Sequence, residues 1–137
     1  MTQSLPFEKE SFDLIFHPVS NCYIEDVRHV WSECYRILKP GGRSLNGQDN
    51  GFNFLFDEDG RAVKYRLPFN PLRNRELLNL PEMNDSGVQF PHTLEDQIRG
   101  PLKAGFRLLD CYEDTNGSGV LHEYGVPTFW ATLFVKE

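Results

Sequence analysis

The chain has 137 residues, of which 39% are hydrophobic and 25% charged, values typical of one globular domain. Its formal charge of −6 argues against a nucleic-acid binder, because phosphate binding requires a basic surface. No apolar run approaches the ~18 residues of a membrane span, and the first residues lack the apolar core of a signal peptide. Three widely spaced cysteines, Cys22, Cys34 and Cys111, favour neither a disulfide framework nor a zinc site. A reducing cytoplasm is therefore the expected location.

A strand and an amphipathic helix are expected in the first third of the chain. The apolar run 11–16 lies between Pro6 and Pro18 and is typical of a parallel strand with both faces covered. Residues 27–38 show an apolar stripe at helical spacing. The residues of this stripe are Val27, Val30, Trp31, Cys34 and Leu38. Residues 40–42, Pro-Gly-Gly, are expected to end the helix.

A second strand is expected over residues 43–48, because a helix packed on a parallel sheet returns the chain to that sheet. Ser44, Asn46 and Gln48 alternate with apolar or small residues, so one face of this strand is expected to be polar and partly solvated. The strand–helix–strand beginning predicts an α/β fold with a right-handed crossover.

The middle of the chain, residues 51–92, is expected to be an insertion into this domain. Two apolar runs, 52–56 and 62–67, flank the turn residues Asp59-Gly60, which predicts a β-hairpin. The proline-bearing stretch that follows has little periodicity and is expected to contain about one helical turn near residues 75–80.

A kinked helix is expected after the insertion. Thr93, followed three residues later by an acidic side chain, has the spacing of an N-terminal cap. Leu94, Ile98 and Leu102 are expected to face the core, and Pro101 is expected to kink or end the helix.

Two β-rich runs, 106–112 and 128–135, complete the expected sheet as an antiparallel pair joined by a polar loop with glycines. The core of one domain, spanning 1–137, would therefore be built from residues 5–50 and 93–137.

The chain contains two sequence motifs, each several residues long, whose separation matches that of one known family named below. The first is Leu5-Pro6-Phe7-Glu8, followed after two residues by Ser11-Phe12-Asp13-Leu14-Ile15. The second is Tyr35-Arg36-Ile37-Leu38-Lys39-Pro40-Gly41-Gly42. Together they resemble the centre of a class I S-adenosylmethionine-dependent methyltransferase. The segments 17–26, 112–114, 121–124 and 127–129 resemble a bacterial subgroup of uncharacterised methyltransferases of the small-molecule type.

The resemblance implies a partial Rossmann-like methyltransferase fold with a mixed sheet and the inserted hairpin. Its strands would be the family's fourth, fifth, seventh and sixth, in that spatial order, with the seventh antiparallel. The family holds S-adenosylmethionine with a glycine-rich loop and an acidic residue that would both precede Met1. The chain is thus expected to be a truncated, acceptor-side half that is inactive alone. The free edge of its first strand would be covered by a second copy or by a missing N-terminal half.

Candidate site residues lie where the parallel strands end, since ligands gather at the carboxyl ends of strands in open α/β sheets. The resemblance places donor and acceptor beside the loop after the first strand. His17 is a candidate general base, or else it ends the strand and hydrogen-bonds to the backbone. Asn21 and Tyr23 are candidate acceptor-orienting residues, with loop or cap residues as the alternative. Asp49 and Asn50 are expected to line the pocket after the second strand.

The loop between the last two strands opens on the same side as His17 and contains His122 and Glu123. A carboxylate beside an imidazole can orient it and raise its basicity, which makes the pair a catalytic candidate; the alternative is a solvated hairpin loop. The resemblance implies cofactor contacts for Leu5-Pro6-Phe7 and His17. The histidines show no metal-ligand spacing, so no metal site is expected.

The expected function is S-adenosylmethionine-dependent methylation of a small molecule, with this chain supplying the acceptor pocket. One alternative is a non-catalytic remnant or assembly module, indicated by the missing glycine loop and the polar second strand. A further alternative is a ligand-binding module that uses the 52–67 hairpin as a lid.

Overall fold

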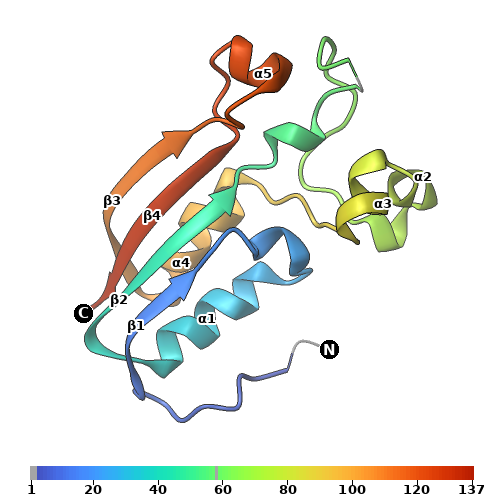
Figure 1. Ribbon diagram of the computed structural model, residues 1–137. Helices are drawn as coiled ribbons and strands as arrows, with labels where there is room; N and C mark the ends of the chain where they lie inside the picture. The colour runs from blue at the N-terminus through green and yellow to red at the C-terminus, as the bar shows by residue number, and fades with distance from the viewer. Residues whose placement is uncertain (1–2, 58) are drawn as a thin grey trace.

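The computed structural model describes residues 3–57 and 59–137 (Figure 1). The strands are β1 (Phe12–His17), β2 (Leu38–Asp49), β3 (Phe106–Asp114) and β4 (Phe129–Lys136). The α-helices are α1 (Val27–Ile37), α2 (Arg75–Leu78), α3 (Pro81–Ser86), α4 (Gly100–Ala104) and α5 (Gly119–Glu123). Shorter pieces are the 3₁₀ turns Asn21–Tyr23, Phe52–Phe54 and Pro71–Arg73 and the π-helical turn Glu95–Arg99.

The four strands form one mixed sheet in the order β1-β2-β4-β3. β1 and β2 are parallel, and β4 runs antiparallel to both β2 and β3. This is the expected order of the family's fourth, fifth, seventh and sixth strands, with the seventh antiparallel. The carboxyl ends of β1, β2 and β3 therefore lie at one edge of the sheet.

Helix α1 begins where the sequence predicts. The carboxylate of Asp26 accepts a hydrogen bond from the backbone N–H of His29 at 3.0 Å, which caps the first turn. The helix ends at Ile37, three residues before Pro40, because Leu38 already belongs to β2. The apolar stripe still reaches the core, since Leu38 is fully buried there.

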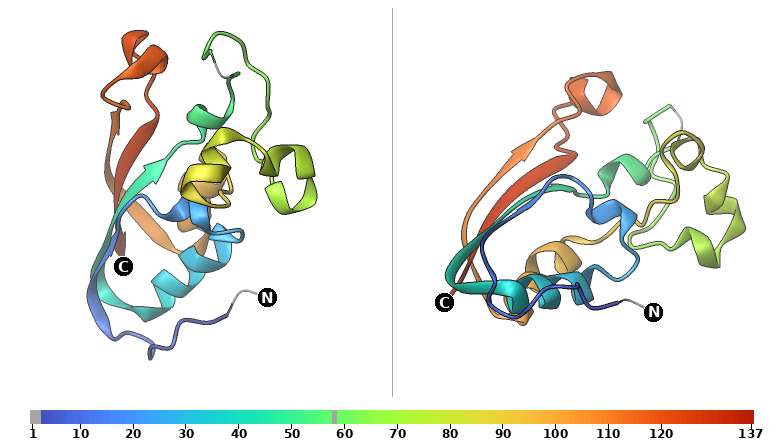
Figure 2. Two further views of the ribbon diagram at one scale, coloured as in Figure 1. Left: turned by 45° about the vertical axis from the view of Figure 1, so that its right-hand side comes forward. Right: turned by 60° about the horizontal axis from the view of Figure 1, so that its bottom comes forward.

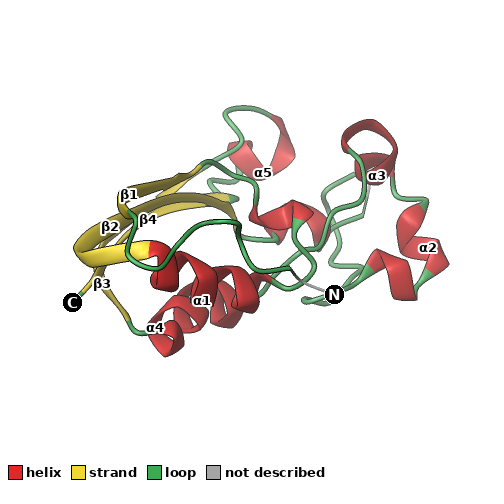
Figure 3. Cartoon of the chain, turned by 90° about the horizontal axis from the view of Figure 1, so that it is seen from below, coloured by secondary structure: helices red, strands yellow, loops and turns green. Residues whose placement is uncertain are grey.

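Helices α1 and α4 cover one face of the sheet (Figures 2 and 3), and the core between the two layers is formed by Cys34, Leu38, Phe106 and Phe134. The other face, here called the outer face, has no helix over it in the described part of the chain. Leu14 and Phe16 point to this side and are 59% and 65% exposed. The expectation that β1 is covered on both faces is therefore wrong for the described residues.

The polar side chains of β2 lie on the covered face, so the expectation that they are partly solvated is wrong. Ser44, Asn46 and Gln48 are all buried, whereas Leu45 between them faces outward. The Ser44 hydroxyl donates to the Asn46 side-chain oxygen at 2.8 Å, and Thr132 of β4 donates to Gln48 at 3.1 Å. Hydrogen bonds within the protein thus replace those to water, which allows a polar stripe to be buried.

The inserted hairpin is reduced to one antiparallel bridge between Phe56 and Val63. The expected turn is present, because the Asp57 carboxylate accepts from the backbone N–H groups of Arg61 and Ala62. The predicted first strand is instead the 3₁₀ turn Phe52–Phe54, so the two runs pair at one point only. The stretch after the bridge holds α2 and α3, more helix than the single expected turn.

The helical segment after the insertion contains the expected cap, but the side chains that it turns toward the core are not all the expected ones. The Thr93 hydroxyl accepts from the Asp96 N–H at 3.1 Å and donates to its carboxylate at 2.8 Å. Leu94 and Leu102 are exposed, contrary to expectation, while Gln97 is fully buried. The wider π-helical turn before Pro101 shifts the helical register, which moves Gln97 onto the inner face.

The loop between β3 and β4 contains the short helix α5 (Figure 1). In the part of the chain that the structure describes, no helix combines the length and apolar character needed to cross a bilayer.

Candidate functional site at the carboxyl edge of the sheet

His17 is the last residue of β1 and lies against α1. Its ring meets the Trp31 ring edge to face, with the centroids 5.7 Å apart. Nδ1 of His17 is buried and has no hydrogen-bond partner among the described residues. Burial lowers the pKa of His17, so the ring is neutral near pH 7 and its nitrogens can serve as one donor and one acceptor.

Asn21 follows in the 3₁₀ turn after β1. Its side chain is fully buried, yet neither its amide nitrogen nor its oxygen has a partner among the described residues. An unpaired buried polar group costs about 1–3 kcal/mol, so such a side chain is rarely tolerated without a role. Tyr23, two residues later, is half exposed and points away from the core.

Asp49 is the last residue of β2, Asn50 follows it, and both are largely buried. The Asp49 carboxylate accepts from the Gly51 N–H at 2.6 Å, and Asn50 accepts from the Phe52 N–H at 2.9 Å. Burial raises the pKa of Asp49, although the hydrogen bond from Gly51 opposes this change. Both side chains therefore shape the turn after β2, and the pocket-lining role stays a prediction.

The loop after β3 is tied to the loop after β2. Asn116 donates to Asn53 at 2.7 Å and accepts from it at 3.2 Å. His122 lies on the exposed helix α5, where Nδ1 and the Thr115 hydroxyl are 2.6 Å apart. Glu123 is also exposed and makes no hydrogen bond with His122 in the described part of the chain. The two residues share the edge with His17, but the structure does not join them as a pair.

The segment Leu5-Pro6-Phe7 lies along the last turns of α1, away from the carboxyl edge. Arg36 donates to the backbone oxygens of Leu5 and Phe7 at 3.1 and 2.8 Å. Glu33 accepts from the Leu5 N–H at 2.8 Å, and the hydrogen bond from Arg36 lowers the pKa of Glu33 to about 2. These contacts fix the segment to the helix, so Leu5–Phe7 and His17 do not meet in one place.

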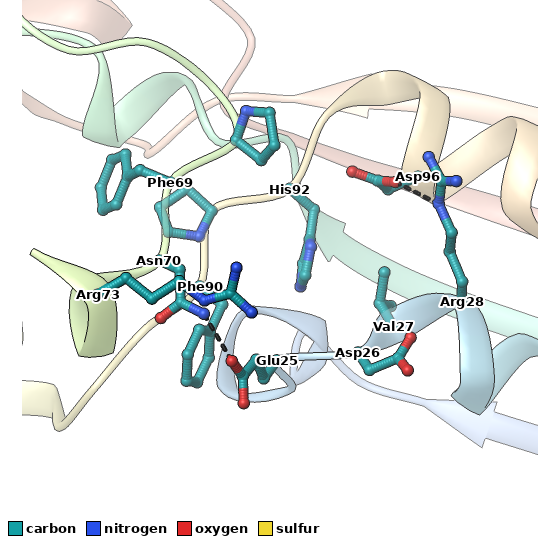
Figure 4. A pocket seen from close by; sticks show the side chains of 12 residues that line it. Glu25, Asp26, Val27, Arg28, Phe69, Asn70, Arg73, Phe90, His92 and Asp96 are labelled. Carbon is teal, nitrogen blue, oxygen red and sulfur yellow. Dashed lines mark hydrogen bonds and ion pairs between the residues drawn. The ribbon is translucent and has the colours of Figure 1, made fainter. Parts of the chain in front are cut away.

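A pocket of about 520 Å³ lies beside this edge, between the start of α1 and the inserted segment (Figure 4). Its lining residues are Glu25, Asp26, Val27, Arg28, Pro68, Phe69, Asn70, Arg73, Phe90, Pro91, His92 and Asp96. Among the described residues that line it, none is a site residue predicted from the sequence. The volume is in the range of small-molecule sites, ~300–1,000 Å³.

Two residues that connect this pocket to the sheet are absent from the sequence predictions. Nε2 of His92 lies 3.2 and 2.8 Å from the backbone oxygens of Asn21 and Ile24. The Gln97 amide donates to the backbone oxygens of Asp49 at 2.8 Å and His92 at 3.3 Å. Gln97 thereby fixes the pocket wall to the end of β2. The hydrogen bond between Gln97 and Asp49, at the end of β2, joins residues 48 positions apart. The residues next to Gln97 in the sequence therefore do not predict this contact.

The described residues fit only part of an S-adenosylmethionine site. The glycine-bearing loop 117–119 follows β3, and a Cβ added at Gly117 or Gly119 would meet nothing within 4 Å. A loop that cradles a cofactor needs close backbone approach, so this one does not fit that role. His17 and Asn21 have unpartnered polar atoms at the correct edge and fit an orienting role. In the described ranges, no cluster of three potential metal ligands occurs.

Comparison with known proteins shows which proteins the chain resembles. A family described as "Methyltransferase domain" matches residues 1–45. An uncharacterised methyltransferase of Bacillus subtilis (strain 168), YbaJ, is 41% identical over 138 residues, which cover 95% of this chain and 53% of that protein. A sterol methyltransferase-like protein of Botryococcus braunii is 29% identical over 119 residues, 85% of this chain and 27% of that protein. The chain thus spans about half or less of the length of these relatives.

Solved structures show the same fold. An S-adenosylmethionine-dependent methyltransferase of Mesorhizobium loti superposes with a TM-score of 0.74 at 17% identity, covering 96% of this chain and 65% of that one. A Listeria monocytogenes protein described as a putative S-adenosylmethionine-dependent methyltransferase gives a TM-score of 0.69 at 17% identity, covering 97% and 65%. These relatives imply S-adenosylmethionine as the cofactor of the family. In sequence the chain is thus similar to methyltransferases, and in strand order it has the fold of solved S-adenosylmethionine-dependent methyltransferases.

Proposed function

We propose that this chain forms the acceptor side of an S-adenosylmethionine-dependent methyltransferase that acts on a small molecule. The observation that carries the proposal is the fully buried side chain of Asn21, whose two polar atoms have no partner in the described structure. Asn21 lies at the carboxyl edge, where α/β proteins bind ligands, four residues after His17 with its own unpartnered Nδ1. A bound ligand would supply the missing hydrogen bonds. The neighbouring pocket has the volume of a small-molecule site.

Methyl transfer from a sulfonium group depends mainly on holding donor and acceptor in line. Asn21 can both donate and accept a hydrogen bond, which suits a residue that orients an acceptor. His17 can accept a proton because burial lowers its pKa and keeps the ring neutral. No metal ligand set is needed for this reaction.

The proposal includes completion of the site by other polypeptide. The described residues fit the acceptor side only, so we expect the chain alone not to bind S-adenosylmethionine. A cytoplasmic location is also part of the proposal, supported by three free cysteines, of which Cys22 and Cys34 are buried.

The test is calorimetric titration with S-adenosylhomocysteine, the demethylated product of the cofactor. The chain alone should give no binding heat up to about 1 mM ligand. A mixture with the part of the Bacillus relative that this chain does not match should bind. Tight binding by the chain alone would refute the half-site proposal, and no binding by the mixture would refute the methyltransferase function.

A non-catalytic assembly module is the second candidate, favoured by the exposed outer face of the sheet and the free edge of β1. Leu14 and Phe16 expose apolar surface beside unpaired backbone groups, a combination that promotes association. The same mixture separates the two candidates, because an assembly module would bind the partner polypeptide without gaining affinity for S-adenosylhomocysteine.

A further inference from the structure

The pocket between the start of α1 and the inserted segment has features of a binding site beyond its volume. Phe69, Phe90 and Val27 supply apolar wall, while charged side chains lie around them (Figure 4). Phe90 is buried and its backbone N–H donates to Cys22, which anchors this wall to the turn after β1. Pockets with apolar walls and a few convergent polar groups are typical small-molecule sites.

The tautomer of His92 follows from its hydrogen bonds. Nε2 faces the backbone oxygens of Asn21 and Ile24, which can only accept, so Nε2 carries the hydrogen. Burial lowers the pKa of His92, although these hydrogen bonds and the nearby carboxylates of Asp26 and Asp96 oppose the change. The ring is therefore neutral near pH 7, and Nδ1 is an acceptor without a partner in the described structure. His92 is thus fixed in position with one free lone pair.

Arg73 brings a free positive charge to the same pocket. Its guanidinium has no hydrogen-bond or ion-pair partner among the side chains and backbone groups that the structure describes, and Figure 4 shows it directed toward the middle of the pocket. The acidic side chains nearby are engaged. Glu25 accepts from Asn70 at 2.6 Å. Asp96 pairs with Arg28 at 2.7 Å.

Asp26 is engaged as well, since it caps α1 through the backbone N–H of His29. Among the described groups that line the pocket, the Arg73 guanidinium has no hydrogen-bond or ion-pair partner and His92 keeps one unpaired ring nitrogen. These two groups are therefore available to a ligand. A guanidinium pairs best with a carboxylate, and a lone pair needs a donor such as a hydroxyl.

We propose that this pocket binds a small flat molecule that carries both a hydroxyl group and a carboxylate. The carboxylate pairs with Arg73, the hydroxyl donates to Nδ1 of His92, and the apolar body lies against Phe69 and Phe90. The assignment of this molecule as the methyl acceptor rests on the proposed function; its binding does not. Gln97 connects His92 to the end of β2, so the bound hydroxyl would lie beside the carboxyl edge of the sheet.

The experiment is an NMR titration of the ¹⁵N-labelled chain with para-hydroxybenzoate. Benzoate lacks the hydroxyl, para-hydroxybenzamide lacks the charge, and tyramine carries the opposite charge. We expect para-hydroxybenzoate to shift the amide signals of residues 25–28, 69–73 and 90–92 and to bind about tenfold more tightly than each of the other three.

The variant Arg73→Gln should weaken para-hydroxybenzoate about tenfold while leaving para-hydroxybenzamide unchanged, because only the carboxylate contact is lost. Arg75→Gln is the matched control, since Arg75 is exposed on α2 and does not line the pocket. We expect Arg73→Gln to fold, because the Arg73 side chain is exposed. The hydroxyl contact is measured on the unchanged chain, by comparing para-hydroxybenzoate with benzoate.

Preferential binding of tyramine, unaltered affinity in Arg73→Gln, or no shift in the pocket signals would each overturn this assignment. These outcomes are distinct from a failure of the methyltransferase proposal. If the completed assembly binds S-adenosylhomocysteine but para-hydroxybenzoate does not shift the pocket signals, the hydroxy-acid site is refuted and the methyltransferase proposal stands. If para-hydroxybenzoate shifts the pocket signals but the assembly does not bind S-adenosylhomocysteine, the methyltransferase proposal is refuted and the hydroxy-acid site stands.

Discussion

At the scale of single residues, the proposed site contains polar atoms that are buried without a ligand. Asn21 and the Nδ1 atom of His17 have no partner in the described structure, whereas His92 has both partners for Nε2. The sequence makes His17 and Asn21 candidates because His17 ends the first strand and Asn21 follows it. It could not identify His92, whose orientation depends on backbone oxygens 68 and 71 residues away.

We predict that the stability of the chain falls as the pH drops below about 6.5. His17 has a pKa below its ordinary value in the folded chain, so the unfolded chain binds a proton first and acid favours unfolding. His92 acts in the same direction. Each histidine can contribute a slope of up to about 1.4 kcal/mol per pH unit.

Urea denaturation at about pH 7.5 and about pH 5.5 measures this slope for the parent chain and for His17→Phe. Phenylalanine retains an aromatic ring beside Trp31, so the variant should remain folded and lose part of the slope. A parent chain with equal stability at both pH values would contradict the prediction, as would a variant that keeps the full slope.

At the scale of elements, the contact between α1 and the segment 95–104 holds one wall of the pocket in place. Trp31 is buried and its indole N–H donates to the backbone oxygen of Asp96 at 3.0 Å. Pro101 has no N–H that could donate to the backbone oxygen of Gln97. This oxygen instead accepts a hydrogen bond from the side-chain amide of Gln48 at 3.4 Å. The expected kink thus connects the helix to the polar stripe of β2.

We predict that Gly100→Ala destabilises the chain by about 1–3 kcal/mol. A Cβ at position 100 would lie 2.8 Å from Cδ1 of Trp31, so the helix or the indole must move. Thermal or urea unfolding measures the loss. Leu102→Ala, at an exposed position of the same helix, should change stability by less than about 0.5 kcal/mol. Equal effects of the two substitutions would show that the close packing at Trp31 is unimportant.

At the scale of the whole molecule, the described residues cover one face of the sheet and leave the outer face uncovered. Parallel strand pairs are almost always covered on both faces, and β1 is an edge strand in the described chain. Tyr112 of β3 is 66% exposed, which shows that apolar exposure extends across the sheet from Leu14 and Phe16. A further layer of polypeptide would bury this surface.

We therefore predict that the chain without a partner forms oligomers whose size increases with concentration. Light scattering after size-exclusion chromatography should show this for the parent chain, and the double variant Leu14→Lys, Phe16→Lys should be a monomer because charges prevent burial of the outer face. The double variant Leu94→Lys, Leu102→Lys is the control, with the same charge change at exposed leucines outside the sheet. A monomeric parent chain would count against an association surface.

The resemblance carried by two motifs predicted the strand order, and the sequence by itself determined the elements whose signals are local: β1, the start of α1, the Thr93 cap and the two β-rich runs of β3 and β4. The hydrophobic spacing and the capping residues are sufficient for these, since each acts over a few neighbouring residues. Only the tertiary structure decided that the polar residues of β2 face inward, that Gln97 replaces Leu94 and Leu102 in the core, and that His92 and Arg73 share a pocket. Those outcomes depend on hydrogen bonds between segments that are distant in the sequence. The neighbouring residues do not determine whether a polar side chain hydrogen-bonds to water or to such a distant partner.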